Sequence, residues 1–185
     1  MNSVDSNSRS NAENSMIGAL GSSAVAEISQ ELRQLLADMF TLYVKTKGFH
    51  WHITGRHFRD YHLLLDEQAE QIFAIIDDIA ERARKIGGTT LRSITEIAKY
   101  KRLSDEPDST SPREMLFALA EDNARMLECL RRTHELCERY GDIGTASLVE
   151  VWIDQAERRI WFLNATLDLG HEGQTHAAIR QFATK

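Results

Sequence analysis

The residues best suited to metal chemistry are concentrated in one stretch of the sequence. The chain contains seven histidines, and four of them fall between positions 50 and 62. Acidic residues follow at helical spacing. Imidazole nitrogens and carboxylate oxygens together suit iron, manganese or zinc. This cluster comprises His50, His52, His57, His62, Asp66, Asp77 and Glu81.

Four members of the cluster share one face of a predicted helix. Apolar residues recur every three or four positions from Leu65 to Ile86, and two glycines then end the pattern. At 100° per residue, the four side chains lie roughly 80° to 180° from the core-facing Ile72. Leu63 and Phe73 lie on the same face, so we expect a partner to cover it. The four residues are His62, Asp66, Asp77 and Glu81.

The length of this helix separates the four residues into two pairs. Asp66 and Asp77 are 11 residues apart, or about 16 Å along a helix, so one metal centre cannot join them within a chain. Antiparallel pairing of two copies about a two-fold axis would bring His62 and Asp66 of one chain near Asp77 and Glu81 of the other. Because a two-fold interface repeats every contact, this hypothesis predicts two shared sites in each dimer.

Two common metal motifs are missing from the sequence. The intrachain di-iron centre of ordinary ferritin-like bundles uses Glu-x-x-His on two helices, and no histidine here has a glutamate three positions before it. The His-Glu-x-x-His motif of zinc proteases is also missing. An interface site is therefore the better placement for the metal.

The whole chain predicts an all-α fold with four long helices. The first apolar stripe should end near Gly55, and the second is the helix described above. The segment Ser111-Pro112-Arg113-Glu114 starts a third helix that runs to Gly141, because it combines a cap, a proline in the first turn and a capping-box glutamate. A fourth stripe ends at Gly170.

One connection is much longer than the others. Residues 89–110 link the second and third helices, and the spacing of Ser93 and Glu96 predicts a short helix within them. A single long crossover is the ferritin-like variant of the four-helix bundle. We predict a disordered N-terminal tail over 1–22, the bundle over 23–170 and a loose C-terminal tail over 171–185.

Charge and composition exclude several classes of protein. Lys and Arg number 22 against 28 Asp and Glu, a net charge of −6, which argues against a basic nucleic-acid binder. Neither a membrane-spanning run nor a secretory signal is recognisable, so we expect a cytoplasmic protein. Cys129 and Cys137 would lie about 12 Å apart along a helix, too far to bridge, and we expect buried, reduced thiols.

The metal cluster also resembles the signature of a known family. The segment His50-Trp51-His52-Ile53-Thr54-Gly55, with Phe58 and the helical ligands after it, is similar to that of the Dps proteins. These mini-ferritins are named as DNA-binding proteins from starved cells. The likeness is specific over residues 49–86, and the helical plan extends it to roughly 24–169.

The resemblance implies a ferroxidase. Dps proteins form hollow shells of twelve identical subunits that oxidise Fe²⁺, preferentially with hydrogen peroxide, store ferric mineral and so protect DNA from oxidative damage. The family pattern implies a mono- or di-iron site at each two-fold interface, where Zn²⁺ or Mn²⁺ could replace iron. Trp51, beside the site, is a candidate for intercepting oxidising equivalents. The implied ligands are His50, His62 and Asp66 from one subunit and Asp77 and Glu81 from the other.

Two features depart from the family pattern. Many members bind DNA through a lysine-rich N-terminal arm, but this arm has no lysine and the C-terminal tail offers only Arg180 and Lys185. Tight DNA binding is therefore not expected, whereas association with the nucleoid stays open. The family also lines its three-fold pores with acids near the start of the last helix, where Asp142, Glu150 and Asp154 are candidates among apolar neighbours.

Two other functions stay open at this stage. The protein could be a structural DNA-compacting shell whose metal site only stabilises dimers, or a buffer that binds zinc or manganese without redox turnover. Peroxide-dependent oxidation of Fe²⁺ separates both from a ferroxidase.

The other conspicuous side chains are expected to have structural roles or to be exposed. We expect His52 on the surface near the site, His57 at a helix start, His134 in the core, Asp78 on the surface, Trp152 and Trp161 in packing, and His171 and His176 in the loose tail.

Overall fold

Helices alone make up the regular structure of the described residues. The computed structural model describes residues 20–104 and 111–167, and no strand occurs within these ranges. The all-α prediction is confirmed. The helices are α2 (Ser22–His52), α3 (Phe58–Lys85), α4 (Ile94–Tyr100), α5 (Pro112–Tyr140) and α6 (Ile143–Leu167).

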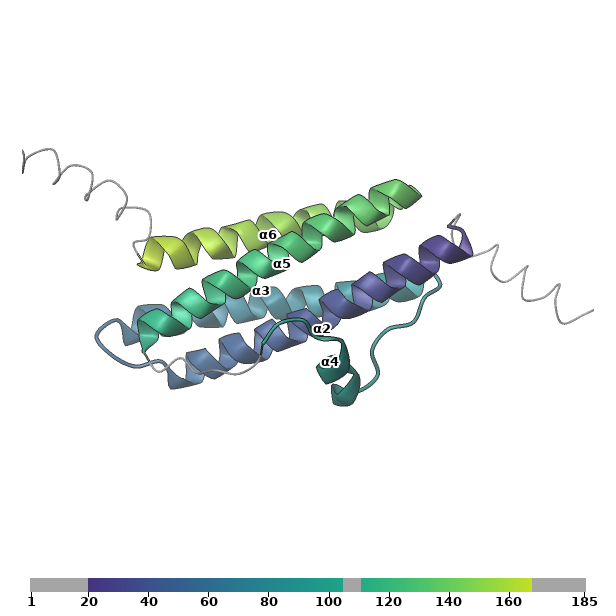
Figure 1. Cartoon of the computed structure of the whole chain (residues 1–185). Coiled ribbons are helices and arrows are strands. Elements are labelled where there is room, and N and C mark those ends of the chain that lie inside the picture. Colours follow the sequence, from purple (N-terminus) through teal and green to yellow (C-terminus); the bar gives the residue numbers. More distant parts are fainter. Residues whose placement is uncertain (1–19, 105–110, 168–185) are drawn as a thin grey trace, which may run out of the picture.

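The four long helices form a bundle of two hairpins. Helices α2 and α3 pack together as one pair and α5 and α6 as the other, with α2 also against α5 and α3 against α6 (Figure 1). The short α4 lies against the outside of α2, within the crossover from α3 to α5. This is the ferritin-like arrangement that one long crossover predicted.

The helix ends follow the predicted signals. The Ser111 hydroxyl accepts a hydrogen bond from the backbone N–H of Glu114 at 3.2 Å, and the Glu114 carboxylate accepts one from the backbone N–H of Ser111 at 2.9 Å. At the other end of α5, Gly141 takes a left-handed conformation with φ 68°. Such a residue ends a helix and turns the chain towards the next one.

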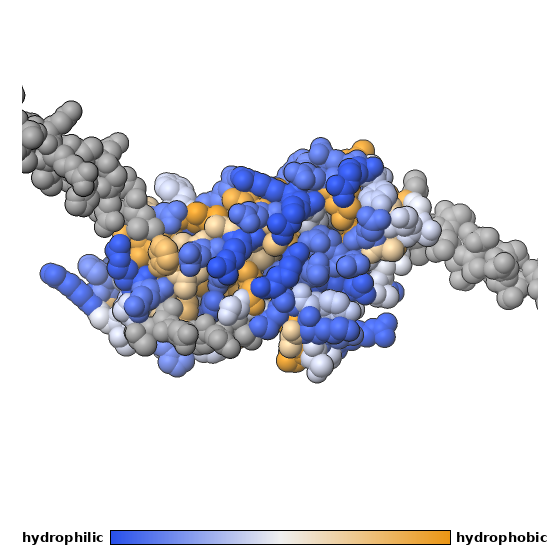
Figure 2. All heavy atoms as spheres, in the orientation of Figure 1, coloured by the Kyte–Doolittle hydropathy of each residue, from blue (hydrophilic) through white to orange (hydrophobic). Residues whose placement is uncertain are grey.

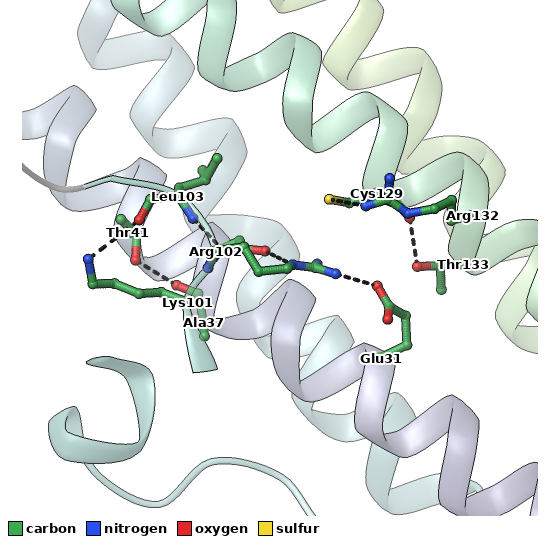
Figure 3. Close-up of polar contacts among 10 residues, drawn as sticks. Glu31, Ala37, Thr41, Lys101, Arg102, Leu103, Cys129, Arg132 and Thr133 are labelled. Atoms are coloured by element: carbon green, nitrogen blue, oxygen red, sulfur yellow. Dashed lines mark hydrogen bonds and ion pairs between the residues drawn. The ribbon is translucent and has the colours of Figure 1, made fainter. Parts of the chain in front are cut away.

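A buried carboxylate on α2 holds the end of the crossover. Asp38 is fully buried, accepts hydrogen bonds from the backbone N–H of Leu103 at 3.1 Å and from Nε of Arg102 at 2.7 Å, and also bonds to the backbone N–H of Arg102. The Arg102 guanidinium then reaches Glu31 at 2.7 Å (Figure 3). Because every bond crosses from the crossover to α2, Asp38 fixes the path of the chain after α4.

Both cysteines are buried and free, as predicted. Burial raises the pKa of each thiol, and that of Cys137 reaches about 12. No helix in the two described ranges is long and apolar enough to cross a membrane. Most of both predicted tails, together with Gly170, His171 and His176, lies outside the described residues.

Candidate metal centre

The turn between α2 and α3 brings two histidines face to face. His50 lies near the end of α2 and His62 near the start of α3. Between them Gly55 has φ 103°, a conformation that glycine adopts without strain and that lets the chain reverse tightly. The two imidazole rings stack with centroids 3.7 Å apart.

The backbone carbonyl of each histidine fixes the tautomer of the other ring. Nδ1 of His50 lies 2.8 Å from the backbone carbonyl oxygen of His62, and Nδ1 of His62 lies 2.9 Å from the carbonyl oxygen of His50. A carbonyl oxygen can only accept, so each Nδ1 carries the hydrogen. The lone pair of each neutral ring is then on Nε2, and the backbone bond orients the ring as in histidines that bind metals.

Asp66 completes this group one helical turn after His62. Its Oδ1 lies 3.8 Å from Nε2 of His50 and also forms an ion pair with Lys47. The hydrogen bond from Lys47 lowers the pKa of the Asp66 carboxyl group and raises that of the lysine. We call His50, His62 and Asp66 the histidine group.

The remaining two candidate ligands form a separate acidic pair on α3. Asp77 and Glu81 are both exposed. Glu81 forms an ion pair with Lys85 at 2.8 Å, and that hydrogen bond lowers the pKa of the Glu81 carboxyl group. Within residues 20–104 and 111–167 of one chain, no three His, Cys, Asp or Glu side chains form a group that could hold a metal ion.

Apolar side chains lie beside Asp77, the first member of the acidic pair. Phe73, one turn before Asp77, is 56% exposed although its ring lies 5.2 Å from that of Tyr43. A groove of about 740 Å³ runs between α2, α3 and the start of α4, and its lining includes Phe73, Asp77 and the highly exposed Ile94. Leu63, near the histidine group, is also exposed.

The aromatic residues near the histidine group have different environments. Trp51 is 67% exposed at the end of α2. Phe58 instead packs on the site, with its ring centroid 4.9 Å from that of His62. Lys47 was missed by the sequence reasoning, although it lies one turn before His50 and that spacing could have indicated its position.

Three of the secondary expectations agree with the structure. His52 is exposed and its Nδ1 bonds to the backbone carbonyl oxygen of Gly48 at 2.7 Å. His57 directly precedes α3. Asp78 is exposed. None of the three belongs to the histidine group.

The prediction that His134 lies in the core is wrong. The side chain is partly exposed at the edge of α5, where Nε2 lies 3.0 Å from Glu150 and Nδ1 lies 3.7 Å from Glu138. The start of α6 passes this edge, so the carboxylate of Glu150 comes within hydrogen-bond distance of the ring, while Glu138 on α5 lies farther away. One of the acids proposed for the pores, Glu150, is therefore engaged with a histidine.

Two further expectations are corrected. Asp142 is not an open pore acid, because it is buried and forms an ion pair with Arg82 at 2.5 Å. Of the tryptophans on α6, Trp152 is buried as predicted, but Trp161 is 66% exposed on its surface. Asp154 remains exposed.

Comparisons with known proteins agree with this architecture. A family model described as a ferritin-like domain matches residues 29–171. DNA protection during starvation protein 1 of Deinococcus radiodurans is 31% identical over 142 residues, which cover 76% of this chain and 69% of that protein.

Solved structures give the same result. A Dps protein from Vibrio cholerae O1, described as a member of a broad superfamily of ferritin-like diiron-carboxylate proteins, is 28% identical with a TM-score of 0.77, covering 80% of this chain and 93% of that one. Antigen TpF1 from Treponema pallidum is 29% identical with a TM-score of 0.77, and the match covers 81% of this chain and 97% of that one.

Proposed function

The chain belongs to the Dps family of ferritin-like proteins, and on this basis we propose that it oxidises Fe²⁺ and stores the ferric product. The observation that carries the proposal is the reciprocal bonding of His50 and His62, which leaves both Nε2 atoms outside these bonds, with Nε2 of His50 3.8 Å from Oδ1 of Asp66. Two neutral imidazoles and one carboxylate suit Fe²⁺. Iron is here the substrate.

A second subunit is proposed to complete each site. Asp77 and Glu81 are too far along α3 to reach the histidine group of their own chain, since 11 residues of helix span about 16 Å. The apolar groove beside Asp77, with Phe73 and Ile94 at its edge, supports the presence of a covering copy. Antiparallel pairing of α3 with its two-fold mate would then form two sites per dimer. Twelve such subunits would make the hollow shell of the family.

The reaction consumes two Fe²⁺ ions for each peroxide. Each iron loses one electron, the two electrons reduce H₂O₂, and with two waters the products are two FeOOH units and four protons. Carboxylates favour Fe³⁺ because a hard anion attracts the higher charge more strongly. The ion pair with Lys47 lowers the pKa of the Asp66 carboxyl group further, although this group is ionised at neutral pH with or without it. Trp51 beside His50 is the proposed acceptor of oxidising equivalents that escape.

This chemistry would protect DNA without binding it. The Deinococcus radiodurans relative is named for DNA protection. Fe²⁺ and peroxide together generate hydroxyl radical, so removing both would protect nearby DNA without any contact between protein and DNA. The N-terminal arm of this chain has no lysine with which to contact DNA phosphates. We place the protein in the cytoplasm, with the bundle over 23–170 between two tails.

The test is oxidation of Fe²⁺ by the purified protein, with peroxide or with air as oxidant. We expect peroxide to give the faster rise in ferric absorbance, and sedimentation at a protein and an iron-oxide wavelength to show both signals in one large species. Binding of Zn²⁺ or Mn²⁺ without faster iron oxidation than in buffer would favour the metal buffer. A large species that binds DNA at physiological salt but carries no iron would favour the structural shell.

A further inference from the structure

A buried arginine lies where three helices of the bundle meet. Arg159 on α6 is 1% exposed. Its Nε donates to the side-chain oxygen of Asn123 on α5 at 2.8 Å, and its backbone carbonyl oxygen accepts from Gln68 on α3 at 3.4 Å. The proposed iron chemistry uses none of these residues.

The charged end of this arginine has no partner in the part of the chain that the structure describes. Neither Nη1 nor Nη2 makes a hydrogen bond, and no carboxylate pairs with the guanidinium among residues 20–104 and 111–167. Lys45 on α2 provides a contrast, because that buried cation is paired with Asp122 at 2.7 Å. Buried charges in proteins are ordinarily paired, since removing one from water without compensation is costly.

The guanidinium keeps its charge despite this environment. Burial lowers the pKa of Arg159 to about 10. That value is still well above neutral pH, so the side chain is a cation in the folded protein under ordinary conditions. A water molecule could accept its N–H bonds but could not neutralise it.

A small cavity lies against the same side chain. Its volume is about 10 Å³, and Arg159, Gln68, Leu64 and Phe162 contribute to its lining. A space of this size fits a water molecule or a single small ion better than it fits phosphate, sulfate or a carboxylate group. The nearest lining acid, Glu67, is exposed, accepts from Gln71 at 3.1 Å and faces Arg158 at 3.7 Å.

We infer that Arg159 and this cavity form a binding site for one monatomic anion, with chloride as the cellular occupant. The anion would accept from Nη1 and Nη2 and supply the missing negative charge. Because Gln68, Asn123 and Arg159 come from three helices, an ion at this point would stabilise the contact between α3, α5 and α6.

The direct test is a crystal structure of the full-length protein grown in sodium bromide, with anomalous data collected at the bromine edge. An anomalous peak within hydrogen-bond distance of Nη1 or Nη2 of Arg159 is expected. A water without anomalous signal at that place, or the Glu67 carboxylate rotated onto the guanidinium, would overturn the inference.

A solution measurement uses thermal unfolding at constant ionic strength. Replacing gluconate with chloride should raise the Tm of the wild type. The expected rise is about 3–5 °C for each tenfold increase in chloride concentration above the Kd. Arg159→Met should lose this dependence, whereas Arg131→Met, at an exposed arginine of α5 that pairs with Glu157 at 2.9 Å outside the cavity, should keep it. Equal Tm values in gluconate and chloride for the wild type would contradict the inference, even if Arg159→Met failed to fold.

Discussion

His50 and His62 each donate a hydrogen bond from Nδ1 to the backbone carbonyl oxygen of the other, at 2.8 and 2.9 Å, while their rings stack. Each histidine therefore fixes both the tautomer and the orientation of the other. Loss of either ring would remove one ligand and the stacking contact of the second, whose own Nδ1 bond goes to a backbone carbonyl and would remain. The effect of each substitution on iron oxidation should therefore come mainly from the lost ligand.

His62→Ala should slow peroxide-driven oxidation of Fe²⁺ by roughly 10–100-fold, because it removes a ligand and the ring that stacks on His50. The measurement is the initial rate of ferric absorbance after mixing. His52→Ala is the matched control, since His52 makes the same kind of Nδ1 bond, to Gly48, but is exposed. Equal losses in the two variants would show that the histidine group is not the oxidation site.

Lys47→Met should bind Fe²⁺ several-fold more tightly than the wild type at neutral pH, since the lysine ammonium and the metal compete for the Asp66 carboxylate. Anaerobic calorimetry measures this affinity, and Lys47→Arg, which keeps the charge, should stay close to the wild type. Weaker binding by Lys47→Met would mean that the lysine positions Asp66 and does not compete with iron.

The thiols should be inert in the folded protein. With a pKa of about 12, Cys137 forms roughly a thousandfold less thiolate at a given pH than a thiol with a pKa of 9. Ellman's reagent at pH 8 should therefore leave Cys137 untouched in the native protein and titrate both cysteines after denaturation. Rapid native reaction of both thiols would contradict the buried environment.

The same thiol predicts how stability changes with pH. The unfolded thiol ionises near pH 9 and the native thiol only near pH 12, so the unfolded state loses protons first. The stabilisation that Cys137 gives to the folded state is fully present below pH 9. Between pH 9 and about 12 it is lost, so the free energy of unfolding should fall over this range. Cys137→Ala should show a smaller fall over this range in chemical denaturation.

Much of the fold follows from local signals in the sequence. The apolar stripes predicted all four long helices, and the capping box at Ser111 and the glycine at position 141 predicted both ends of α5. These predictions succeed because helix periodicity and helix caps involve residues close together in the chain. The spacing of His62 and Asp66 is local in the same way.

The failures involve contacts between distant segments. The sequence pattern around Asp38 and Arg159 does not single out either residue. Their roles depend on hydrogen bonds to Arg102 and Asn123, which are 64 and 36 residues away in the chain. The error at His134 has the same cause, since its angular position on α5 is near the apolar side, but the acids of α6 and its own helix decide its environment. Side-chain pairing across helices depends on packing that periodicity does not describe.

The measurement that tests the shared site most directly is complementation between two inactive variants. His62→Ala and Asp77→Asn would each be purified, shown to be inactive in iron oxidation, then unfolded together in equal amounts and reassembled. In a mixed dimer both changes fall in one site and the other site is intact. Random pairing makes half of the dimers mixed, so we predict recovery to about a quarter of wild-type activity. As a control, wild-type subunits that are unfolded and reassembled in the same way must regain full activity. If they do, and the mixed variants reassemble to native size but recover no activity, a site built from two subunits is contradicted.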